Sequence, residues 1–185
     1  MIKFIEHHEP GYALRTVANA RAADLTIAFA VDFKTPGEIL THKVAYGKYI
    51  AFNIGWYREP SDIYQQCLDV QRTIIEKNVK VLNVAGNGLY TLYAYEKRQQ
   101  QDVDDLIYKL LHDILIDVFT ADMTIRSGGQ TGVDEAALKA GDKLGLDCTC
   151  LAPKNWLFRD INGKDHMHDP DAFCARFGEQ YVNNI

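Results

Sequence analysis

The chain has 185 residues, 47% of them hydrophobic, and a formal net charge of −5. This length and apolar content suffice for one complete core, so we expect residues 1–185 to form a single domain. No run approaches the roughly 20 apolar residues that a membrane-spanning helix needs. The basic residues do not gather into the stripe that nucleic-acid binders use to contact phosphates. We therefore expect neither a membrane nor a nucleic-acid partner.

The first residues contain an acidic side chain and a histidine pair where a secretory signal would be apolar, which predicts a cytoplasmic protein. The cysteines have no Cys-x-x-Cys spacing, so the sequence argues against a zinc site and favours buried thiols in a reducing compartment. They are Cys67, Cys148, Cys150 and Cys174. We assign no metal site, and the sequence does not identify a cofactor.

Strand-like and helix-like segments alternate along the chain, which is typical of the α/β class. Several apolar, β-branched runs have the length and composition of strands that are buried on both faces. These runs are Leu25–Ala30, Tyr49–Ile54, Val79–Val84, Met123–Arg126 and Leu146–Cys150. The pattern predicts a Rossmann-like three-layer sandwich with a mostly parallel sheet of about five strands.

The predicted helices differ in how clearly their ends are marked. Asp62, followed three residues later by Gln65, has the spacing of a capping box at a helix start. The segment Asp102–Phe119 carries an apolar face wide enough to contact both the sheet and a partner helix or subunit. From this face we expect a homo-oligomer. A third helix begins at the turn near Gly132 and ends before Gly145.

The strongest functional signal is a glycine-rich turn between a strand and a helix. A helix N-terminus exposes unpaired N–H groups and the positive end of its dipole, and glycines let a phosphate approach the backbone. We interpret the turn as the binding site of a phosphate-bearing, nucleotide-like ligand. The alternative is that the glycines only allow a tight turn. The candidate ligand-binding residues here are Ser127, Gly128, Gly129, Gln130, Thr131 and Asp134.

Asp134 has two interpretations: it accepts hydrogen bonds from a ribose, or it only complements the helix dipole. The turn is neither a Walker A loop nor a Gly-x-Gly-x-x-Gly fingerprint. Ordinary ATP hydrolysis and NAD-linked hydride transfer are therefore disfavoured.

The segment Ser127–Leu138, SGGQTGVDEAAL, resembles the opening motif of the molybdenum-cofactor carrier family, a branch of the SLOG superfamily of Rossmann-like proteins. Other segments are similar to further parts of that family: Arg15–Phe29, Pro36–Ile54, Val81–Gly86 and Ala152–Lys154. The resemblance implies additional ligand contacts at Gly37, Thr41, Asn83, Gly86 and Lys154. In the segment that follows Lys154, Trp156 could stack on a base while Lys154 and Arg159 neutralise phosphates, or it could only anchor the loop to the core.

The order of the motifs differs from the family, because VLNVAG precedes the glycine turn here and follows it there. A circular permutation would produce this order without moving the loops in space. Two departures place carboxylates near the expected phosphate: Glu38 stands in place of a glycine, and Glu135 in place of a basic residue. We expect Glu135 to face solvent or the opposite loop.

Two functions remain open from the sequence. The first is a binding or sequestering protein, and the resemblance implies molybdenum cofactor or an ADP-ribose-derived or cyclic-nucleotide signal as its ligand. The second, implied by the phosphoribohydrolases of the superfamily, is N-glycosidic hydrolysis of a nucleoside monophosphate. Asp134, Glu135 or Glu38 could supply the carboxylate for this reaction. We favour binding without catalysis.

Overall fold

A six-stranded parallel sheet forms the centre of the computed structural model, which describes residues 1–56, 58–118 and 120–179. The strands lie side by side in the order β1-β6-β5-β4-β2-β3. Their bounds are β1 (Ile2–Glu6), β2 (Leu25–Ala30), β3 (Tyr49–Asn53), β4 (Val81–Gly86), β5 (Thr124–Ser127) and β6 (Asp147–Ala152). The strand that leads into the glycine turn, β5, lies inside the sheet and pairs in parallel with both β4 and β6.

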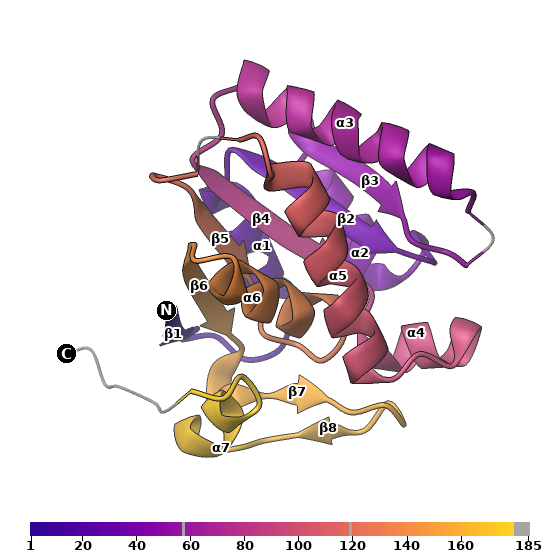
Figure 1. Cartoon of the computed structure of the whole chain (residues 1–185). Coiled ribbons are helices and arrows are strands. Elements are labelled where there is room, and N and C mark those ends of the chain that lie inside the picture. Colours follow the sequence, from indigo (N-terminus) through magenta and orange to yellow (C-terminus); the bar gives the residue numbers. More distant parts are fainter. Residues whose placement is uncertain (57, 119, 180–185) are drawn as a thin grey trace.

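Helices cover both faces of this sheet, which confirms the Rossmann-like three-layer sandwich (Figure 1). One face carries α3 (Pro60–Glu76), α5 (Gln100–Leu115) and α6 (Val133–Lys143), and the other carries α1 (Ala13–Ala22) and α2 (Pro36–Val44). The short helix α4 (Leu89–Glu96) follows β4. Every residue of β2 is buried, as expected for a strand with a helical layer on each side.

The expected number of about five strands is corrected to six, because β1 was not predicted. β1 is an edge strand that pairs with β6 alone, and only Ile2 among its residues is buried. Polar residues such as Lys3 and Glu6 therefore do not conflict with strand formation there. An edge strand with one buried side chain leaves no apolar run for sequence reasoning to detect.

The prediction of a capping box at Asp62 is wrong. Helix α3 begins earlier, at Pro60, and Glu59 precedes it without a side-chain capping bond. Proline suits the first turn of a helix because the N–H group it lacks has no intrahelical partner there. A capping box does occur before α5, where Gln99 and Asp102 each accept a hydrogen bond from the other's backbone.

The wide apolar face of α5 is covered within the same chain. Its buried side chains pack against α6 on one side and α3 on the other: Val103, Ile107, Leu110, Leu111 and Ile114. The face therefore needs no second subunit to shield it from water. Helix α5 ends at Leu115, and Phe119, the expected end, lies outside the described residues. A homo-oligomer stays a prediction, but the apolar face of α5 no longer supports it.

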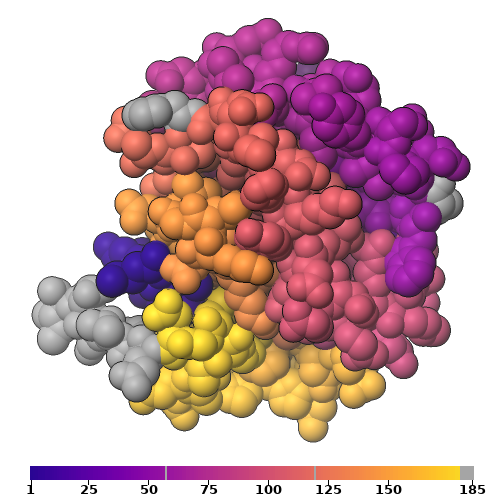
Figure 2. Space-filling view, viewed as in Figure 1, coloured from indigo at the N-terminus to yellow at the C-terminus, as the bar shows by residue number. Residues whose placement is uncertain are grey.

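The segment after Pro153 contains several short elements of secondary structure. It forms a 3₁₀ turn (Lys154–Trp156), a small antiparallel hairpin of β7 (Phe158–Arg159) and β8 (Asp165–His166), and α7 (Pro170–Ala175). Phe173 of α7 is fully buried. Figure 2 shows this segment, in yellow and light orange, closing the lower end of the molecule beneath α6. In the described part of the chain, no helix is long and apolar enough to cross a membrane.

Candidate functional site

A cavity of about 570 Å³ opens at the carboxyl ends of the central strands. In open parallel sheets this is the edge at which ligands bind, and the volume is in the range of small-molecule sites. The first turns of α1, α2, α4 and α6 all contribute to its lining. Of the predicted ligand contacts, the lining includes Gly37, Thr41, Asn83, Gly86, Gly128, Gln130, Thr131 and Asp134.

The floor of the cavity contains a buried ion pair between α1 and α6. Arg15 donates through Nη1 to Asp134 Oδ2 at 2.9 Å, and both side chains are less than a tenth exposed. Burial raises the pKa of Asp134, whereas the adjacent guanidinium opposes this rise. Asp134 is therefore more than a residue that complements the dipole of its helix, because it neutralises a buried cation.

The glycines of the turn leave space for neighbouring side chains, and Gly129 adopts a positive φ angle. A Cβ at Gly128 would lie 1.4 Å from Arg15 Nη1, so this glycine makes space for the guanidinium. Gly129 has a φ of +68°, and a Cβ there would lie 2.5 Å from the Cys150 sulfur, in the core. Gly129 is also absent from the cavity lining. A side chain at Gly129 would therefore disturb the packing of the core and would not block the cavity. This contradicts our interpretation that Gly129 lets a phosphate approach the backbone.

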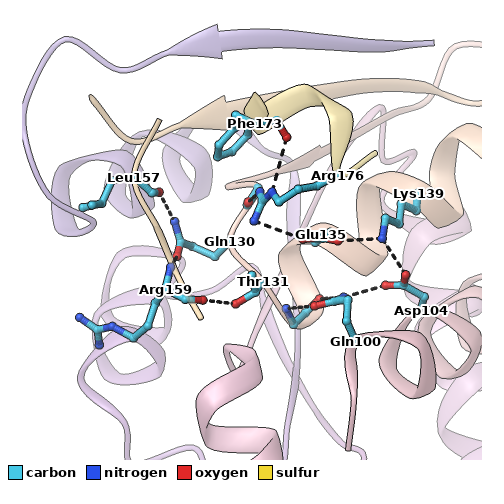
Figure 3. Close-up of polar contacts among 12 residues, drawn as sticks. Gln100, Asp104, Gln130, Thr131, Glu135, Lys139, Leu157, Arg159, Phe173 and Arg176 are labelled. Carbon is cyan, nitrogen blue, oxygen red and sulfur yellow. Dashed lines mark hydrogen bonds and ion pairs between the residues drawn. The ribbon is translucent and has the colours of Figure 1, made fainter. Parts of the chain in front are cut away.

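The polar side chains of the turn bind the C-terminal hairpin (Figure 3). Gln130 donates through Nε2 to the Leu157 carbonyl at 2.7 Å and accepts from the Arg159 N–H at 3.1 Å. The Thr131 hydroxyl donates to the Arg159 carbonyl. These residues line the cavity, but their hydrogen bonds hold β7 against the turn. Ser127 lies behind the cavity, fully buried, and its hydroxyl donates to the Val84 carbonyl at 2.6 Å.

A chain of charged side chains fixes the turn from behind (Figure 3). Glu135 pairs with Lys139 at 2.7 Å and with Arg176 at 3.3 Å, and Lys139 reaches Asp104 of α5 at 2.8 Å. Arg176 Nη2 also donates to the Gly129 carbonyl at 2.5 Å. The expectation that Glu135 faces solvent is therefore wrong: it is 4% exposed and connects α6 to α7. Its partners, rather than a ligand, compensate its charge.

Glu38 lies on the first turn of α2 and lines the cavity at 3% exposure. Its backbone N–H donates to Thr35 Oγ1 at 3.3 Å, which caps the helix. Its carboxyl oxygen Oε2 has no hydrogen-bond partner. Burial raises the pKa of Glu38 to about 8, and the carboxyl groups of Asp134 and Asp32 add to the rise. The side chain is therefore largely neutral at pH 7.

Other polar groups of the floor are also incompletely bonded. Asn19 accepts from Arg126 Nε at 2.9 Å through Oδ1, whereas its amide nitrogen has no partner. Arg15 Nε is likewise buried without a partner. Asn83 donates to Thr26 Oγ1 at 3.3 Å. Buried polar groups without partners are uncommon in folded proteins, so this group of side chains marks the floor as a candidate binding surface.

Asn87 organises the loops around the cavity. Its side-chain oxygen accepts from the N–H groups of Val31 and Asp32 at 2.9 Å, and its amide donates back to the Asp32 carbonyl. These bonds join the loop after β4 to the loop after β2. Between them, Gly86 allows a close approach, because a Cβ there would lie 2.1 Å from the Phe29 carbonyl oxygen.

The rim of the cavity is formed with the C-terminal hairpin. Arg159 of β7 lines the cavity with its side chain about half exposed, and it pairs with Asp165 of β8 at 2.8 Å. The Tyr12 hydroxyl donates to the same carboxylate at 2.8 Å. Tyr90 of α4 lines the cavity from the other side and contacts the hairpin near Gly163.

The structure places Lys154 and Trp156 outside the cavity lining. Lys154 is exposed, and Trp156 is 5% exposed with its ring 5.3 Å from that of Phe173. Trp156 therefore anchors its loop to the core, the second of the two interpretations. Sequence reasoning named Arg159 as a possible phosphate contact, but it did not propose Tyr12, Arg15 or Asn19 as site residues. The spacing of Arg15 and Asn19, one helical turn apart, was the available signal.

Neither a comparison with protein-family models nor one with curated proteins finds a match for this chain. Among the described residues, no group of at least three His, Cys, Asp or Glu side chains could hold a metal ion. The geometry and polar groups of the cavity are therefore the basis for inferring a function.

Proposed function

We propose that this protein binds a phosphate-bearing, nucleotide-like small molecule in the cavity at the carboxyl edge of its sheet. The observation that carries the proposal is the cavity itself, with the incompletely bonded side chains of Arg15, Asn19 and Glu38 on its floor. A ligand that supplied hydrogen-bond partners to these groups would compensate them. The first turns of four helices surround the same space, and their N-terminal dipoles favour an anion.

The resemblance to the molybdenum-cofactor carrier family supports a carrier or sequestering role. It suggests molybdenum cofactor, an ADP-ribose derivative or a cyclic nucleotide as the ligand. The side chains of Gln130 and Thr131 bond to β7 and contribute less to phosphate binding than the motif implied. In this proposal the phosphate lies near the rim, where Arg159 provides a half-exposed positive charge.

A second candidate function is hydrolysis of an N-glycosidic bond, and the two carboxyl groups of the floor favour it. A protonated Glu38 could donate its proton to the departing base, while water adds to the ribose carbon with help from Asp134. Such a division of roles needs one neutral and one ionised carboxyl group. Glu38 has a raised pKa, and Asp134 lies against a guanidinium.

One experiment separates binding from hydrolysis. The purified protein is incubated with a mixture of nucleotides, washed and denatured by heat, and both the wash and the released fraction are analysed by mass spectrometry. An intact nucleotide released from the protein supports binding. A free base together with ribose phosphate in the wash supports hydrolysis. Absence of any retained or cleaved compound would contradict both functions.

A further inference from the structure

The polar groups of the cavity differ in burial between its floor and its rim. Arg15, Asn19, Glu38 and Asp134 are each at most 7% exposed and form the floor. Arg159, at the rim, has a side-chain exposure of 47%. A ligand that fills the cavity must therefore lose all contact with water at the floor, whereas the part at the rim stays partly hydrated.

The floor is a poor environment for a phosphate group. Arg15, which lies on the floor, already pairs with Asp134 at 2.9 Å. Glu38 adds a second carboxyl group beside them. A phosphate placed there would lose its water, while the charge of Arg15 is already offset by Asp134. The charged end of a ligand is better placed at the rim.

The groups around Glu38 favour its neutral form. Asp134 from α6 and Asp32 from the loop after β2 both oppose ionisation, in addition to burial. Tyr49 of β3 lies close enough that Glu38 contributes to the raised pKa of its phenol, and His42 of α2 packs on the Tyr49 ring. Arg15, the nearby cation, is bound to Asp134. A neutral carboxyl group carries one O–H donor and one carbonyl acceptor.

We propose that Glu38 recognises the uncharged end of the ligand, donating a hydrogen bond from its carboxyl group to a neutral acceptor on a heteroaromatic ring or amide edge. This inference rests on the proposed function and adds an orientation to it: the ring reaches the floor and the phosphate stays at the rim. The unbonded Oε2 of Glu38 is the atom that the ligand would satisfy, and the amide nitrogen of Asn19 offers a second donor on the floor.

The test compares two probes, AMP and ribose 5-phosphate, by calorimetric titration at pH 7 and pH 9.5. If only neutral Glu38 binds the ring, a pKa of about 8 predicts that the affinity of the wild type for AMP falls roughly thirtyfold over this range. Ribose 5-phosphate lacks the heteroaromatic base that would reach the floor, so its weaker binding should not depend on Glu38.

Two variants control this measurement. Glu38→Gln keeps an N–H donor that cannot ionise, so we expect AMP affinity near that of the wild type at pH 7 and little change at pH 9.5. Glu38→Leu keeps the approximate size but removes the donor, and we expect a loss of about tenfold at pH 7. Circular dichroism checks that each variant is folded.

The outcomes separate this inference from the proposed function. AMP binding that is equally tight at both pH values in the wild type would overturn the role of Glu38 and leave nucleotide binding intact. A ¹³C NMR titration that shows an ionised Glu38 carboxylate at pH 7 would overturn it without any ligand. Failure of both probes to bind, with no compound retained from the nucleotide mixture, would overturn the proposed function and this inference together.

Discussion

Arg15 and Asp134 are 119 positions apart in the sequence, and their side chains form a 2.9 Å ion pair beneath the glycine turn. The pair joins the first turn of α1 to the first turn of α6, on opposite faces of the sheet. Gly128 lies against the guanidinium and leaves no room for a Cβ. Within the motif SGGQTGVD, Asp134 thus pairs with the guanidinium of Arg15, and Gly128 leaves space for that guanidinium.

Removing both members of this pair should cost less stability than the two single removals added together. We expect Asp134→Asn and Arg15→Met each to lower the free energy of unfolding by about 3 kcal/mol, because each leaves a buried group without its partner. The double variant should lose about 2 kcal/mol less than the sum of the single losses. Urea denaturation at pH 7 measures this.

The control for that cycle is Asp62→Asn, in the first turn of α3, where the side chain is exposed. It removes the same charge from a helix N-terminus and should cost a few tenths of a kcal/mol, up to about 1. An equally small loss for Asp134→Asn would mean that Asp134 acts only through the helix dipole.

Two glycines of the cavity should respond differently to a methyl group. Gly128→Ala places a Cβ against Arg15 and Asp134, and we expect a loss of about 1–3 kcal/mol in the free energy of unfolding. Gly37→Ala meets no atom within 4 Å and lies within α2, so it should be neutral or slightly stabilising. Thermal and urea denaturation of the two variants provide the comparison, and equal stabilities would argue against the tight packing at Gly128.

Glu38 should make the stability of the protein depend on pH. Its folded-state pKa of about 8 lies above the unfolded value of 4.5, so its stabilising contribution is fully present below pH 4.5 and is lost as the pH rises toward 8. Relative to Glu38→Gln, the wild type should lose on the order of 4 kcal/mol between pH 5 and pH 9. Urea denaturation across this range measures both proteins, and parallel profiles would show that Glu38 is ionised in the folded state.

Two basic residues near the C-terminal hairpin differ in their position relative to the cavity. Arg159 lines the cavity, whereas Lys154 is exposed outside it. We expect Arg159→Met to weaken AMP binding about tenfold, since a charge-assisted bond to phosphate is worth about 1.5 kcal/mol or more. Lys154→Met should change affinity less than twofold. Calorimetry at low salt measures both, and the reverse ranking would move the phosphate to the loop at Lys154.

All four cysteines of the chain are buried and unpaired. Burial raises the pKa of Cys67 to about 11 and that of Cys148 to about 12, so the reactive thiolate is scarce at neutral pH. We expect the native protein to react with Ellman's reagent only as slowly as it unfolds, and the protein in urea to release four equivalents at once. Rapid modification of the native protein would contradict the placement of these thiols in the core.

The sequence by itself determined the elements whose signals are local. The strand β2 was predicted with its bounds, because a strand buried on both faces consists almost entirely of apolar residues, and Thr26 is the one polar residue in it. The end of α6 followed from Gly145, which has the positive φ of a helix stop. The succession of strand, glycine turn and helix also predicted the edge of the sheet at which the cavity lies, since parallel strands direct their carboxyl ends to one edge.

Only the tertiary structure decided which atoms the polar side chains of that site contact. Gln130 and Thr131 bond to a hairpin 27 and 28 positions away, and Tyr12 reaches Asp165 across 153 positions. Glu38 is largely neutral because the fold buries it and because two other carboxyl groups approach it from separate elements. A polar residue looks the same in a sequence whether it binds water, a ligand or a distant side chain. Its hydrogen bonding and desolvation depend on neighbours in space, which only the folded structure brings together.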